Sequence, residues 1–272
     1  MKKIRYGTSG NPPNFFKSEF GKDRVNAPDW IASIGLNAYE RMMTYGARMK
    51  EEDAIELGKK AKAHDIFLSV HAPYYIVLTS EKQKTIKNSI NEMLKTLHLS
   101  NIMGAKRIIF HPGFGTDVKK IIAGLKIIEK NDSTGITIHP ETMGKLSQLG
   151  SLNDVLTICE NTECLPCIDW AHLYARNMGK LDFRKTLEEI EKRMGKKALN
   201  ELHCHFYPVE FGEKGEKFHR AVTEKNVFPV FKPLGELIHE FDMKPVLISE
   251  SRDSQDTGAI QMKRAMEKLG YR

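Results

Sequence analysis

The chain has 272 residues, 40% of them hydrophobic, and 42 Lys and Arg against 35 Asp and Glu give it a net charge of +7. This length fits one barrel-sized domain, so we expect a single domain over residues 1–272. No run of about 18 apolar residues appears, and no apolar stretch follows the first lysines, which argues against a membrane span and a secretory signal and predicts a cytoplasmic protein. The positive charge is only weak evidence for association with polyanions.

Eight short segments rich in β-branched and other apolar residues are predicted as strands. They are Ile4–Thr8, Asn37–Met42, Ile66–Val70, Arg107–Phe110, Gly135–His139, Leu165–Asp169, Asn200–Phe206 and Pro245–Ser249. Apolar residues at three- and four-residue spacing between them predict helices over Glu81–Met103, Asp117–Lys130, Asp182–Met194, Val230–Phe241 and Gly258–Leu269.

This alternation of strands and helices is typical of parallel strands joined by crossover helices, and eight such units close into a (β/α)8 TIM barrel. The alternative is an open, doubly wound sheet. That fold would carry a glycine-rich phosphate loop after the first strand, but GTSGNPP runs into prolines rather than into a helix.

The four cysteines are too few and too clustered for a disulfide framework, and we expect them to be buried structural residues. They are Cys159, Cys164, Cys167 and Cys204. Cys204 should face away from its two flanking histidines, because successive side chains of a strand point to opposite faces.

Acidic residues and histidines stand at the ends of the third to eighth predicted strands, where TIM barrels carry their active sites. They are His71, His111, His139, Glu141, Asp169, His172, His203, His205 and Glu250. A lone strand-end histidine is usually a structural residue. Six strands in a row that end in such residues would suffer desolvation and repulsion unless cations bind there, which predicts a metal site. Mixed imidazole and carboxylate ligands favour Zn²⁺, Mn²⁺ or Fe²⁺.

Residues on the outgoing loops are candidates for substrate contact. Tyr74 and Tyr75 are core aromatics or groups that stack on a base, and Arg48 is a solvated residue or a phosphate contact. The charged segment GEKGEKFH after the seventh strand is expected to form a solvated loop. His219 within it is either part of that solvated loop or a further metal ligand.

Six of these segments resemble the endonuclease IV family of apurinic/apyrimidinic endonucleases, within the xylose isomerase-like barrels. The matching motifs are H-x-x-Y at His71–Tyr74, F-H-P-G at Phe110–Gly113, P-E-T-x-G at Pro140–Gly144, C-I-D-x-x-H at Cys167–His172, L-H at Leu202–His203, and Glu250. They run from the third strand to the end of the chain and are specific as a set.

The resemblance implies two or three zinc ions, with manganese as an alternative. His71, His111 and Glu141 would hold one ion; Glu141 would bridge to a second held by Asp169, His203 and Glu250; His172 and His219 would hold a third. Arg48 and Tyr74, with Tyr75 beside it, would contact DNA. The family carries Asp-x-His for the third ion, whereas Lys217 stands two residues before His219, so Glu216 is the candidate substitute. His205 is a further ligand or a phosphate contact.

The implied reaction is hydrolysis of the phosphodiester 5′ to an abasic site in double-stranded DNA, with Glu250 and Glu141 as catalytic residues and Glu250 as proton acceptor. The alternative is a sugar isomerase or epimerase, which would use Glu141, Asp169, His203 and Glu250 alone. The additional histidines favour the nuclease.

Overall fold

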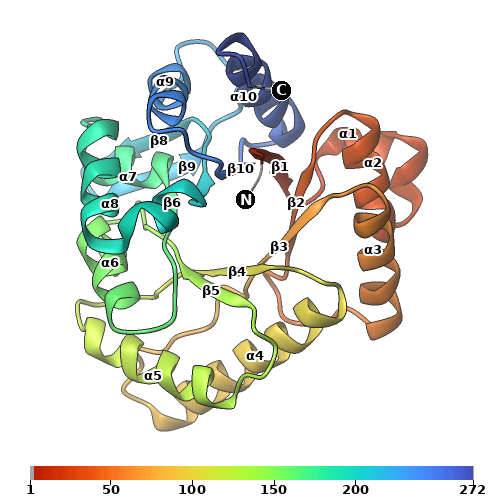
Figure 1. The fold of residues 1–272 in the computed structure, drawn as a ribbon. Coiled ribbons are helices and arrows are strands. Elements are labelled where there is room, and N and C mark those ends of the chain that lie inside the picture. Colours follow the sequence, from red (N-terminus) through yellow and green to blue (C-terminus); the bar gives the residue numbers. More distant parts are fainter. Residues whose placement is uncertain (1–2, 272) are drawn as a thin grey trace.

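The computed structural model describes residues 3–271, and its centre is a sheet of eight parallel strands ringed by helices (Figure 1). The strands follow the order β5-β4-β3-β2-β1-β10-β7-β6. They are β1 (Arg5–Ser9), β2 (Ala38–Met42), β3 (Phe67–His71), β4 (Arg107–Phe110), β5 (Thr137–Pro140), β6 (Cys167–Asp169), β7 (His203–His205) and β10 (Val246–Ser249). Each of the eight strands lies within its predicted segment or extends one residue past it.

β5 and β6 are the two edge strands of this sheet, and they lie next to each other. Glu141 forms a parallel bridge with Cys167, and the amide of Leu165 donates to the carbonyl of Ile138 over 3.1 Å. This contact nearly closes the sheet. The fold is therefore the predicted TIM barrel.

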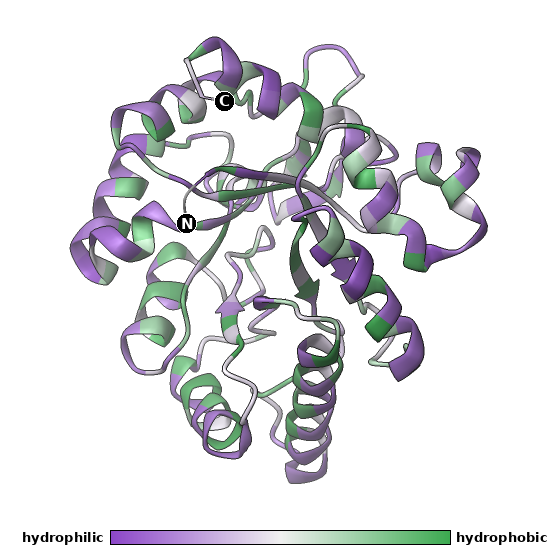
Figure 2. Cartoon of the chain, turned by 45° about the vertical axis from the view of Figure 1, so that its right-hand side comes forward, coloured by the Kyte–Doolittle hydropathy of each residue, from purple (hydrophilic) through white to green (hydrophobic). Residues whose placement is uncertain are grey.

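The helices lie around the barrel and turn their apolar faces toward the strands (Figure 2). They are α1 (Pro13–Lys17), α2 (Ala27–Ser33), α3 (Glu51–Ala63), α4 (Gln83–Ile102), α5 (Val118–Asn131), α6 (Leu152–Glu160), α7 (Trp170–Arg176), α8 (Phe183–Asn200), α9 (Lys232–Glu240) and α10 (Gln255–Lys268), with 3₁₀ turns at Glu19–Lys22 and Arg24–Asn26.

Helix α5 shows why these segments are helical. Ile121, Leu125 and Ile128 recur at four- and three-residue spacing and are fully buried against the barrel. Asp117 caps the helix by accepting a hydrogen bond from the amide of Lys119. Burial of such an apolar stripe, more than intrinsic propensity, holds the helix in place.

A two-stranded antiparallel hairpin follows β7, and the sequence analysis was wrong to expect a solvated loop there. Its strands are β8 (Val209–Gly212) and β9 (Gly215–His219). Val209 packs with Tyr207 and with Ala171 of α7 in a small apolar cluster apart from the main core. Gly215 has φ +88°, and a Cβ there would lie 2.2 Å from the carbonyl oxygen of Gly144, so only glycine lets the hairpin dock on the loop after β5.

Two further sequence expectations concern the buried interior and membranes. All four cysteines are buried and unpaired, and Cys204 faces the main apolar core rather than the barrel interior. Within residues 3–271, no helix is long and apolar enough to cross a membrane.

Candidate metal centre

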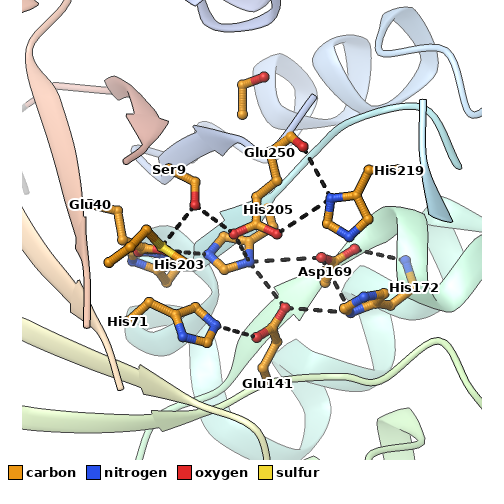
Figure 3. Close-up of polar contacts among 12 residues, drawn as sticks. Ser9, Glu40, His71, Glu141, Asp169, His172, His203, His205, His219 and Glu250 are labelled. Atoms are coloured by element: carbon orange, nitrogen blue, oxygen red, sulfur yellow. Dashed lines mark hydrogen bonds and ion pairs between the residues drawn. The ribbon is translucent and has the colours of Figure 1, made fainter. Parts of the chain in front are cut away.

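Strand ends bring a dense cluster of imidazoles and carboxylates together at one mouth of the barrel (Figure 3). The parallel direction of the strands is the cause, because all their carboxyl ends meet at the same rim. The cluster divides into overlapping groups of three, in each of which the potential ligand atoms lie within 4.8 Å of one another.

The first group is His71, His111 and Glu141, and the second is Glu141, Asp169 and His205, so Glu141 belongs to both. Its Oε2 lies 3.2 Å from Nε2 of His71 and 3.1 Å from Nε2 of His111. Its other oxygen, Oε1, lies 3.1 Å from Nδ1 of His205 and 3.4 Å from Nδ1 of His172. One fully buried carboxylate thus faces two sets of imidazoles, as a bridging ligand would.

The second group surrounds His205. Its Nδ1 lies 3.7 Å from Oδ2 of Asp169 and 3.6 Å from Oε1 of Glu250, in addition to its contact with Glu141. Ser9 at the end of β1 donates to the same Glu250 oxygen over 2.9 Å and fixes that carboxylate toward the centre.

The structure places His205 where the sequence analysis expected His203. The register between β6 and β7 explains the difference. His205 pairs with Asp169 at the rim, whereas His203 pairs with Cys167, two residues further from the rim. Both side chains face the barrel interior, but Nε2 of His203 bonds Glu40 over 3.0 Å. His203 therefore lies in the layer beneath the expected metal position.

The third group combines α7 with the hairpin. Glu216 Oε2 lies 3.1 Å from Nε2 of His172, and its Oε1 lies 3.4 Å from Nε2 of His219. Glu216 thus faces both imidazoles, and its role as the substitute for the Asp-x-His carboxylate stays a prediction. Lys217 lies along the hairpin against Gly212 instead.

Backbone carbonyls orient three of these imidazoles. Nδ1 of His71 faces the carbonyl of Ala72 at 3.0 Å, Nδ1 of His172 that of Thr142 at 2.8 Å, and Nδ1 of His219 that of Glu250 at 3.1 Å. A ring nitrogen that donates to a carbonyl leaves the other nitrogen free as an acceptor. In all three, that free nitrogen is Nε2, which faces a carboxylate of the cluster.

Glu40 on β2 is a buried member of the cluster that the sequence analysis missed. Its Oε1 lies 3.0 Å from Nε2 of His205, and it also belongs to a potential ligand group with His205 and Glu250. The sequence did contain a sign of this role. Glu40 lies inside a predicted strand and shares one face with apolar Ala38 and Met42, and a carboxylate on a buried face is rarely unpaired.

The pKa values within the cluster follow from burial and close opposite charges. Burial would raise the pKa of Glu141, but His205 and His111 hold it well below its ordinary value. Burial would lower the pKa of His172, but Asp169, Glu141 and Glu216 raise it well above its ordinary value. Burial raises the pKa of Asp169 despite its imidazole neighbours.

The donor set fits bound divalent cations. Asp169 Oδ2 is buried and has no hydrogen-bond partner among residues 3–271. Unpaired buried polar atoms are costly, and a cation that binds the carboxylate removes part of that cost. Imidazole and carboxylate donors together suit zinc or manganese better than calcium or magnesium.

Tyr74 and Tyr75 take different positions beside this centre. Tyr74 stacks on His111 with ring centroids 5.0 Å apart, is 53% exposed and lines a pocket that reaches His219 and Glu250. Tyr75 turns toward Gly46 on the loop after β2, and its hydroxyl donates to Glu92 of α4 over 2.9 Å. Arg48 is exposed on that same loop.

Comparison with known proteins shows which family this barrel belongs to. Residues 28–269 match the model of the xylose isomerase-like TIM barrel family. The chain belongs to this family. Within it, an uncharacterized protein from Methanocaldococcus jannaschii is 30% identical over 275 residues and covers 95% of each chain. A probable endonuclease 4 from Listeria monocytogenes is 32% identical over 210 residues, which cover 69% of this chain and 70% of the relative. The Listeria relative confirms the resemblance to endonuclease IV.

Solved structures of other proteins share this fold. Endonuclease IV from Thermus thermophilus superposes with a TM-score of 0.74 at 14% identity, covering 98% of this chain and 99% of the other. The 3-keto-D-glucoside 4-epimerase from E. coli superposes with a TM-score of 0.71 at 14% identity, covering 97% and 99%. At such identities the superpositions support the barrel alone.

Proposed function

We propose that this protein is a metal-dependent apurinic/apyrimidinic endonuclease of the cytoplasm that hydrolyses the phosphodiester 5′ to abasic sites in double-stranded DNA. One observation carries the proposal. The buried carboxylate of Glu141 faces two imidazole sets, while His172, Glu216 and His219 form a third group beside them. Three adjoining ligand groups provide for more than one cation at a single mouth.

Such a centre suits phosphodiester hydrolysis. Two or three divalent ions, zinc or manganese, would generate hydroxide near neutral pH and neutralise phosphate oxygens. No nucleophilic side chain is required. Glu250 is the proton acceptor in this proposal, because its carboxylate is held by Ser9 and remains partly accessible from the pocket that Tyr74 lines. Glu141 orients the imidazoles on either side of it.

DNA contact in this proposal falls to the exposed loops beside the centre. Tyr74 offers an open ring face next to His111, and aromatic rings stack on bases or fill the gap of a missing base. Arg48 supplies a positive charge for the phosphate backbone. Support also comes from the probable endonuclease 4 relatives at about a third identity.

A sugar isomerase or epimerase is the second candidate. Glu141, Asp169, His205 and Glu250 form one compact set around a single imidazole, which is enough for a one-ion sugar site, and a 3-keto-D-glucoside 4-epimerase shares the fold. That reaction leaves His71, His111 and the His172–Glu216–His219 group without a role. The nuclease hypothesis gives each of them a role as a metal ligand.

The test uses a short DNA duplex with one tetrahydrofuran abasic-site analogue, beside an undamaged duplex of the same sequence. Zinc-loaded protein is incubated with each duplex, with and without a chelator. We expect a single cut 5′ to the analogue that the chelator abolishes. A Glu250→Gln variant should retain its fold but cut about 10²- to 10⁴-fold more slowly.

Two outcomes would contradict the proposal. Metal-loaded protein that leaves the damaged duplex intact, yet exchanges a carbon-bound proton of a ketose with solvent, would favour the epimerase. Equal cutting of damaged and undamaged strands would show that the abasic site is not what the protein recognises.

A further inference from the structure

We propose that Glu40 is a positioning residue that holds the His205 imidazole with Nδ1 turned toward the metal centre; this inference rests on the metal centre of the proposed function. Glu40 lies in the middle of β2, is fully buried, and contacts two histidines of β7 from across the barrel.

His205 differs from the other imidazoles of the centre in its orientation. His71, His172 and His219 each turn Nδ1 to a backbone carbonyl and present Nε2 to the carboxylates. His205 is reversed: Nδ1 faces Glu141, Asp169 and Glu250, and Nε2 points back into the barrel. A reversed imidazole needs a different acceptor behind it, and Glu40 Oε1 stands 3.0 Å from its Nε2.

Glu40 is itself held on its other oxygen. Ser69 on β3 donates to Oε2 over 2.8 Å, and Nε2 of His203 lies 3.0 Å from the same atom. These two contacts leave Oε1 for His205. Neither Oε1 nor the His205 Nε2 makes a hydrogen bond with any of residues 3–271, so the 3.0 Å ion pair between them is the contact that offsets the burial of both atoms.

The chemistry of such a contact is well defined. A carboxylate behind a metal-binding imidazole retains the proton on the rear nitrogen, fixes the ring and makes the front nitrogen a better donor. Loss of this kind of partner typically weakens metal binding by about 10- to 100-fold. Glu40 thus acts on the metal through His205.

The test measures stepwise zinc affinity by competition with a chromogenic chelator, for the wild type and for Glu40→Gln. We expect the variant to bind as many ions at saturation, with one affinity lowered by about 10- to 100-fold and the others unchanged. A general structural role would weaken all sites together. Asp256→Asn is the matched control, because Asp256 is also buried but its carboxylate bonds Asn14.

Ser69→Ala serves as a milder second variant if Glu40→Gln does not fold. It removes one of the two contacts on Oε2 and should weaken the same single ion by a smaller factor. Unchanged affinities in a folded Glu40→Gln variant would overturn the proposal. Loss of one whole ion at saturation would also overturn it, because Glu40 would then be a direct ligand. A wild-type chain that binds no metal would instead remove the proposed function itself.

Discussion

Glu216 reaches from the hairpin to His172 on α7, with 3.1 Å between its Oε2 and Nε2 of the imidazole. This contact joins an element outside the barrel to one that begins at a strand end. It also gives the third ligand group a carboxylate at i, i+3 from His219 rather than at i, i+2. The first prediction follows from it.

Glu216→Gln should release one metal ion per chain and leave the other sites loaded, because the substitution removes the one carboxylate that faces both His172 and His219. Elemental analysis after dialysis against limiting zinc measures the change. Lys217→Asp is the comparison: since Lys217 lies against Gly212 and Glu216 already faces both imidazoles, we expect no gain of metal or of activity. An additional ion in Lys217→Asp would show that the third site is incomplete.

Glu141→Gln should have a larger effect than Glu216→Gln. The two oxygens of Glu141 face separate sets of imidazoles, so the loss of its charge weakens two sites at once. Elemental analysis should find a loss of up to two ions, with cutting of abasic duplex reduced by at least about 10²-fold. If only one ion were lost while activity stayed within a factor of two, Glu141 would not bridge.

Metal binding should release protons and weaken as the pH falls. Burial would lower the pKa of His205, but Cys167 and the carboxylates of Glu250, Glu40 and Glu141 raise it well above its ordinary value. The pKa of His172 is also raised well above its ordinary value, by neighbouring carboxylates. These imidazoles therefore keep their protons to a higher pH than an ordinary histidine, and a protonated imidazole cannot bind a metal.

Titration calorimetry of the metal-free protein with zinc checks this expectation in two buffers of different ionisation enthalpy. The apparent heats should differ between the buffers in proportion to the protons released, and affinity should decline steadily from pH 8 to pH 6. Identical heats in both buffers would mean that the imidazoles are already neutral before zinc arrives.

Tyr74→Ala should weaken binding to abasic DNA by about 1–3 kcal/mol, the usual worth of an aromatic ring that stacks on a base. Tyr75→Phe should leave binding nearly unchanged, because it retains the ring and loses only the hydroxyl contact to Glu92. Fluorescence anisotropy with a chelator-treated protein separates binding from cutting. Equal losses in both variants would assign the stacking role to neither residue in particular.

The barrel was predictable because each strand is a short apolar run, and the segments between strands carry apolar residues at helical spacing. Ile108 and Ile109, for example, are both fully buried, as expected for a strand covered on both faces. The order of ligands along the chain was predictable for the same reason, since parallel strands end at one rim.

Three features depended on three-dimensional information. His203 and His205 share one face of their strand, so only the register with Asp169 shows which of them reaches the rim. Glu40 pairs with residues far away along the chain, and its partners are visible only when β2 faces β7 across the barrel. The hairpin has a charged, glycine-rich sequence, and its strand pairing comes from docking at Gly144.

The hairpin also has a consequence for how this centre is assembled. It carries two of the three members of one ligand group, while its apolar side rests on α7 in a cluster of its own. In the proposed centre, the hairpin from Val209 to His219 would therefore decide whether the barrel mouth takes a third cation, and the eight strands would not have to change. Ion number would then depend on one short segment outside the barrel, so a change in that segment alone could alter it.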